Sequence, residues 1–161
     1  QGGGDYTAWV LIGRSVGSVD YVADVQRAQL STDNVRKLLL ATARADIEAY
    51  GQLRWTIPND PGSAGEFQVA EIRRLLEPFK PHLTIVDVAP HRRKGLRARS
   101  HADQINSGNT WLIQGEWNYH YRQEHRKFRD DEQHEFDDQV DAGADAHNLH
   151  TGKGTIEWQA W

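Results

Sequence analysis

Three aspartates near the C-terminal end of the sequence are spaced so that they can act together. In residues 136–142 (FDDQVDA), Asp137 lies four residues before Asp141 and Asp138 lies three before it, which puts all three on one face of a helix. Like charges this close destabilise a helix unless a cation relieves them. Carboxylates in this arrangement suit Mg²⁺ or Mn²⁺. The alternative is a solvated acidic face, but small residues beside the acids favour close packing against a sheet: Ala142, Ala144 and Ala146.

A further aspartate, Asp60, follows an apolar segment at residues 53–58, where a short strand is expected to end. Asp before Pro-Gly is also ordinary turn chemistry, and Ser63 is an ordinary helix cap. Beside a helix with clustered carboxylates, however, an acid at a strand end fits two-metal cleavage of a phosphodiester. In that chemistry two ions, roughly 3.5–4 Å apart, activate water and stabilise the leaving oxygen, and carboxylates from several elements hold them.

A basic segment at residues 91–99 directly follows the apolar run at residues 82–89, and we expect it to be a loop. Its cations could contact phosphates and give salt-sensitive affinity for nucleic acid without base specificity, although a solvated loop is the alternative. The net charge of −4 argues mildly against such a partner. Eight acids are concentrated between Asp130 and Asp145, however, and the rest of the chain has 15 acids against 19 bases. The cations predicted to contact DNA are Arg92, Arg93, Lys94, Arg97 and Arg99.

The residue types exclude several other kinds of site. The sequence has no cysteine, which excludes disulfides, thiolate zinc sites and cysteine nucleophiles. The eight histidines are scattered, and no triplet has the spacing of a zinc site, so we expect most of them at the surface. The glycine-rich segments at residues 2–4 and 152–155 lack the GxxxxGK[ST] pattern, so ATP hydrolysis is not expected.

The order of the expected elements is that of a mixed α/β domain. In chain order they are a hairpin (6–13 and 19–25), a helix from Ser31 or Thr32 to Gly51, a strand (53–58), a helix from Ser63 to Glu77, a strand (82–89), a helix (98–105), a short strand (110–113) and two helices (117–128 and 136–149). This order favours a mixed sheet with helices on both faces, in which sites gather at strand ends. The 161 residues suit one domain, and no apolar run is long enough to cross a bilayer.

Taken in order, six segments resemble the C-terminal nuclease domain of the terminase large subunit of tailed phages and prophages, the motor that packages viral DNA. They are DYTA at residues 5–8, YVADV at 21–25 with Arg27, DPGSAG at 60–65, KGLRA at 94–98, QINSGN at 104–109 and DDQVDA at 137–142. The resemblance covers most of the chain. It implies an RNase H-like α/β fold with a central mixed β-sheet flanked by helices on both faces. Residues 1–150 would form the nuclease domain and residues 151–161 a tail.

The resemblance also implies which residues carry the activity. Asp60 matches the acid that ends the family's fourth strand, and the acids of the final helix are Asp138 with Asp141, or Asp137. They would bind two Mg²⁺ or Mn²⁺ ions and cut double-stranded DNA from concatemers; the predicted metal ligands are Asp60, Asp138 and Asp141, and Asp137 completes the catalytic set. The match at Lys94 and Arg97 implies contact with DNA.

The start of the chain departs from the family pattern. The family's first strand carries another catalytic aspartate and should precede the DYTA segment, so we expect that strand and the ATPase domain to be missing. The first hypothesis is a metal-dependent endonuclease domain. The alternatives are a catalytically incomplete module that docks DNA or the portal and, more remotely, another RNase H-like nuclease such as a junction resolvase. The implied partners are DNA, the ATPase domain, the portal and the small terminase subunit, with no membrane, in the cytoplasm of an infected or lysogenic bacterium.

Overall fold

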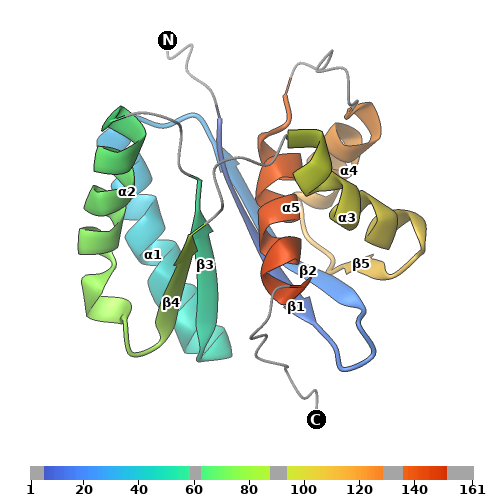
Figure 1. Ribbon diagram of the computed structural model, residues 1–161, viewed down its shortest axis with the longest axis horizontal. Helices are drawn as coiled ribbons and strands as arrows, with labels where there is room; N and C mark the ends of the chain where they lie inside the picture. Colours follow the sequence, from blue (N-terminus) through green and yellow to red (C-terminus); the bar gives the residue numbers. More distant parts are fainter. Residues whose placement is uncertain (1–5, 59–62, 88–93, 129–135, 152–161) are drawn as a thin grey trace. The chain divides into compact units, whose positions relative to one another are not determined.

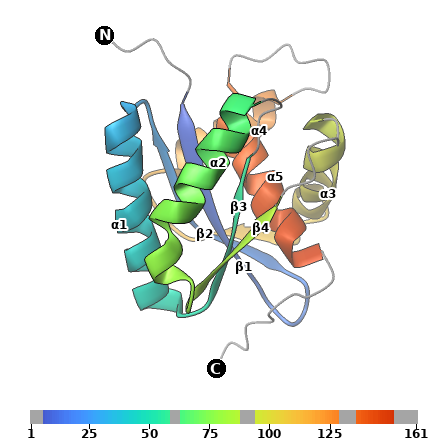
Figure 2. The same ribbon diagram turned by 60° about the vertical axis from the view of Figure 1, so that its left-hand side comes forward.

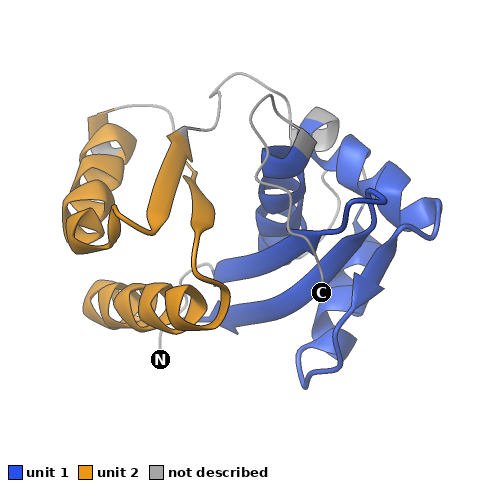
Figure 3. Cartoon of the chain, turned by 90° about the horizontal axis from the view of Figure 1, so that it is seen from below, with its two compact units in different colours: residues 1, 3–29, 92–161 blue, residues 2, 30–91 orange. Residues whose placement is uncertain are grey.

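The computed structural model describes residues 6–58, 63–87, 94–128 and 136–151 (Figure 1). Its strands and helices follow the order predicted from the sequence, with one added 3₁₀ turn. The described chain divides into two compact units (Figure 3): unit 1 holds residues 6–29 with those from 94 onward, and unit 2 holds residues 30–87. Among the described residues, no helix combines the length and hydrophobicity needed to cross a membrane.

Unit 1 is built on a three-stranded mixed sheet. Its elements are β1 (Thr7–Arg14), β2 (Asp20–Ala28), α3 (Lys94–Asn106), β5 (Thr110–Leu112), α4 (Asn118–Lys127) and α5 (Asp138–Thr151). β1 and β2 form the predicted antiparallel hairpin, and β2 pairs in parallel with β5. The alternating apolar residues of the hairpin place one face of the sheet in a core that includes Ile12, Val22, Val25 and Tyr121.

Helix α5 packs against β1 and lies beside α3 and α4, as Figures 1 and 2 show. Small side chains allow this approach. Ala144 is 1 % exposed and forms a buried cluster with Val140 and with Ala98 of α3, while Ala146 packs on the core of the sheet. The small residues that follow the acids therefore do bring this helix close to the sheet.

Gly143 is a point of close approach between α5 and its neighbours. A Cβ atom added at Gly143 would lie 2.8 Å from the Tyr121 hydroxyl and 3.1 Å from Nε2 of His101, and both of these side chains are buried. We expect Gly143→Ala to lower the free energy of unfolding by about 1–2 kcal/mol, because overpacking outweighs the gain in helix propensity. Urea denaturation measures this, with Gly13→Ala as the control because a Cβ there meets no atom within 4 Å. Equal effects of the two substitutions would contradict the expected overpacking.

Unit 2 contains two helices, a short 3₁₀ turn and a two-stranded sheet: α1 (Thr32–Tyr50), β3 (Leu53–Ile57), α2 (Ser63–Leu75), η1 (Glu77–Phe79) and β4 (Leu83–Asp87). β3 and β4 pair in parallel, with Leu53 opposite Leu83. α1 contacts β3, and Arg36 of α1 forms an ion pair with Glu71 of α2. Gly51 ends α1 with a φ of 77°, a conformation that favours glycine.

The prediction that residues 91–99 form a loop is wrong from Lys94 onward, because α3 begins there. Gly95 and the density of charge suggested a loop. The residues around Gly95 are nevertheless good helix formers, and the helix buries Ala98 against α5. α5 begins at Asp138, two residues later than predicted. The described strands pair as the three-stranded sheet of unit 1 and the two-stranded sheet of unit 2.

Candidate functional site

The three C-terminal acids lie at the start of α5. Asp138 is the first residue of the helix and Asp137 precedes it. The backbone N–H of Asp141 donates to the carbonyl of Asp137 at 2.9 Å, which closes the first turn. All three residues are half-buried. One turn at the N-terminal end of a helix, where the helix dipole favours negative charge, therefore carries the predicted acids of the final helix.

The surroundings of Asp138 oppose its ionisation. Burial raises the pKa of Asp138, and the nearby carboxylates of Glu124 and Asp137 raise it further, against the opposing effect of Arg27. A carboxylate in such a setting gains stability when a cation binds beside it, because the cation offsets both the burial and the like charges. Among the predicted metal ligands of α5, Asp138 therefore has a setting that a bound cation would relieve.

Glu124 of α4 holds the start of α5 in place, a role that the sequence did not reveal. Its side chain is 5 % exposed. Oε1 accepts a hydrogen bond from the backbone N–H of Gln139 at 2.6 Å, and Oε2 accepts one from the side-chain amide of Gln139 at 2.5 Å. Glu124 thus caps α5 from a neighbouring helix. A cap that comes from another element leaves no local spacing pattern to find.

Arg27 of β2 lies beside the same group of acids. Its guanidinium carbon is 3.6 Å from the centre of the Tyr6 ring and 4.7 Å from that of Phe136, and its Nε is 3.9 Å from Glu124 Oε2. Both Nε and Nη2 are buried and have no hydrogen-bond partner among the described residues. The aromatic rings hold this cation next to the carboxylates, where it partly offsets their charge.

The other predicted site residues differ in whether the structure describes them and in how exposed they are. Asp60, Arg92 and Arg93 lie outside the described residues, so their roles stay predictions. Lys94 is the first residue of α3. The guanidinium of Arg97 lies 3.6 Å from Asp145 of α5, and the side chain of Arg97 is only 21 % exposed. Arg99 is exposed on α3 and is accessible to a partner.

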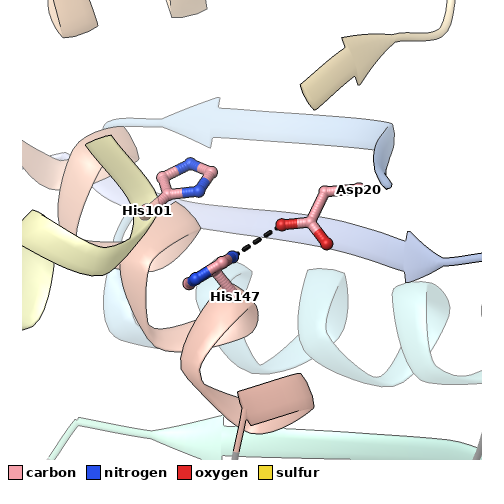
Figure 4. Close-up of side chains that lie close together, drawn as sticks. All are labelled: Asp20, His101 and His147. Atoms are coloured by element: carbon pink, nitrogen blue, oxygen red, sulfur yellow. Dashed lines mark hydrogen bonds and ion pairs between the residues drawn. The ribbon is translucent and has the colours of Figure 1, made fainter. Parts of the chain in front are cut away.

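The expectation that most histidines lie at the surface is wrong for His101 and His147, which are both buried. Together with Asp20 they place one ligand atom each within 4.8 Å of the others (Figure 4). Within the part of the chain that the structure describes, the acids of α5 are not gathered to this degree. Burial lowers the pKa of His101 to about 3, so its ring is neutral. Spacing rules missed the group because its members come from β2, α3 and α5.

The mixed sheet of unit 1 and the order of the elements are those of an α/β domain. The sequence model of the terminase RNaseH-like domain family matches residues 2–149. The chain belongs to this family, which confirms the predicted RNase H-like fold and the resemblance to the C-terminal nuclease domain of terminases. Membership in this family implies, in general terms, that the partners of the chain are DNA and the viral packaging motor. No curated protein and no solved structure matches the chain.

Proposed function

We propose that this domain is a divalent-metal-dependent endonuclease that cuts double-stranded DNA during viral genome packaging. The observation that carries the proposal is the group of acids at the first turn of α5, in a chain that belongs to a terminase nuclease-type family. Burial and the neighbouring carboxylates raise the pKa of Asp138 in this group, which a bound cation would reverse.

The residues of the site fit a hard divalent cation. Asp137, Asp138 and Asp141 offer only oxygen ligands, which Mg²⁺ and Mn²⁺ prefer. The residues proposed to hold two ions are Asp60, Asp138 and Asp141, with Asp137 assisting. When bound, the ions supply an activated water and stabilise the leaving oxygen.

The chain itself fixes the backbone at the start of α5, which carries three of these acids. Glu124 accepts a hydrogen bond from the backbone N–H of Gln139, the residue after Asp138, and so fixes the start of α5. Arg27 adds a cation beside them, which reduces their mutual repulsion in the absence of metal. These contacts support the proposal because they fix the backbone beside Asp138 before an ion binds.

Calorimetry of Mn²⁺ binding separates this proposal from its alternatives. The chain should bind Mn²⁺, and Asp141→Asn should weaken that binding at least tenfold, because it removes one anionic ligand. Absence of Mn²⁺ binding, with DNA binding that falls steeply with salt, would instead identify a docking module of the packaging motor. A strong preference for branched over linear DNA would favour a junction resolvase.

We also propose that the basic residues after β4 contact the DNA backbone: Arg92, Arg93, Lys94, Arg97 and Arg99. Arg99 gives the clearest test, because its side chain is exposed. Arg99→Ala should weaken binding equally for unrelated duplexes and reduce the slope of log K against log salt by about 1. Fluorescence anisotropy at several salt concentrations measures both, with the exposed Arg44→Ala as the control. A slope that Arg99→Ala leaves unchanged would contradict the contact.

A further inference from the structure

Helix α4 has a buried face and an exposed face of different chemistry. On the buried face, Tyr121 belongs to the core of the sheet, and Glu124 caps α5. At 3.6 residues per turn, Tyr119, Arg122 and Arg126 lie on the opposite side of the helix. The exposed residues of α4 are Tyr119, His120, Arg122, Arg126 and Lys127. The helix thus presents a polar face to solvent.

The charged residues of this exposed face all have the same sign. They are Arg122, Arg126 and Lys127, which together we call the basic face of α4. The one acid of the helix is Glu124, which is buried and bonded to Gln139. None of the ion pairs between described residues includes a cation of the basic face. A row of cations without acidic partners produces a positive potential that attracts an anionic partner.

The spacing of the basic face suits the phosphates of a DNA strand. Arg122 and Arg126 are four residues apart, which is about 6 Å along the helix, and a DNA strand carries one charge per roughly 3.4 Å of its axis. The long side chains of these residues can therefore reach different phosphates. Tyr119, which is 66 % exposed, adds a hydroxyl at the N-terminal end of the face, and such hydroxyls also bind phosphate oxygens.

The same helix lies beside the predicted metal ligands of α5. Glu124 accepts a hydrogen bond from the backbone N–H of Gln139, the residue that follows Asp138. Lys127 comes three residues after Glu124, so it lies on the flank of α4 between the outward side and the side that contacts α5. A duplex bound along α4 would therefore pass close to the acids at the start of α5.

We propose that the basic face of α4 binds the phosphate backbone of duplex DNA next to the position where the domain cuts. This surface is separate from the basic residues that follow β4. The proposal rests on the proposed function in taking DNA as the partner, but the binding itself needs no metal ion. Contacts of this kind carry no base specificity, because every phosphate offers the same oxygens.

Fluorescence anisotropy of a labelled duplex in EDTA tests the proposal, and its result does not depend on whether the domain cuts DNA. One variant replaces the basic face of α4: Arg122→Gln, Arg126→Gln and Lys127→Gln. The matched control replaces three exposed cations of unit 2: Lys37→Gln, Arg44→Gln and Arg74→Gln. The first variant should weaken binding at least tenfold at about 0.1 M salt and reduce the slope of log K against log salt by about 2 to 3.

Two results of this measurement would overturn the proposal. Equal weakening in the two variants would show only an effect of total charge. Unchanged DNA binding in the first variant would show that the basic face of α4 serves another partner, such as an acidic protein surface.

A second measurement locates the contact without removing a charge. The sequence has no cysteine, so Gln123→Cys places a single thiol beside the basic face of α4 for attachment of a photocrosslinker. Illumination should crosslink this position to a duplex, with a yield that falls as salt rises. The control is Ala49→Cys, at an exposed position of α1, which should give a yield at least tenfold lower. Equal yields from the two positions would contradict a contact at α4.

Discussion

Asp138→Asn is expected to slow Mn²⁺-dependent nicking of supercoiled plasmid about a thousandfold, which corresponds to about 4 kcal/mol of transition-state stabilisation. The substitution removes the negative charge of the acid whose pKa is raised by burial and by its carboxylate neighbours. The amide keeps nearly the same shape, so packing at the start of α5 should change little. Gel electrophoresis of the plasmid over time gives the two rates.

Asp103→Asn provides the matched control, because it makes the same chemical change at an exposed position of α3. Its nicking rate should equal that of the unchanged chain. Circular dichroism of both variants verifies that the helix content of the chain is unchanged. Equal rates for Asp138→Asn and Asp103→Asn would remove Asp138 from the catalytic set.

Glu124→Ala is expected to lower the free energy of unfolding by about 3 kcal/mol. The change leaves the backbone and side-chain amides of Gln139 without their acceptor, and it removes the carboxylate that faces Arg27. Because Glu124 is buried, water cannot easily replace these bonds. Urea denaturation followed by circular dichroism measures the loss.

Two further variants test whether the lost contacts of Glu124 cause the lower free energy of unfolding. Glu116→Ala changes an exposed glutamate just before α4 and should cost less than about 0.5 kcal/mol. Glu124→Gln keeps an acceptor for the Gln139 N–H but loses the charge, so an intermediate loss is expected. If Glu124→Ala were no more destabilising than Glu116→Ala, Glu124 would not hold the start of α5.

Much of the local structure could be predicted because each element carries its own signal. The helical period of the apolar residues and the flanking Ser31 and Gly51 predict closely where α1 begins and ends. The apolar hairpin strands give β1 and β2. The start of α3 was missed because the charge of the segment suggested a solvated loop, while its burial against α5 depends on a partner far away in the sequence.

The candidate sites also differ in how far the sequence alone could predict them. Asp137, Asp138 and Asp141 lie within one helical turn, so their spacing is visible in the sequence. Glu124 acts on α5 from α4, and the buried group of Asp20, His101 and His147 comes from three elements, so no spacing rule connects them. Histidines that are far apart in the sequence look like surface residues until the fold buries them.

The central claim is that this domain cuts DNA with the help of divalent cations, and plasmid nicking by the unchanged chain tests it most directly. We expect Mn²⁺ or Mg²⁺ to convert supercoiled plasmid to the open circular form at a rate that rises with protein concentration and stops when EDTA is added. No nicking at any protein concentration, or nicking that continues in EDTA, would contradict it.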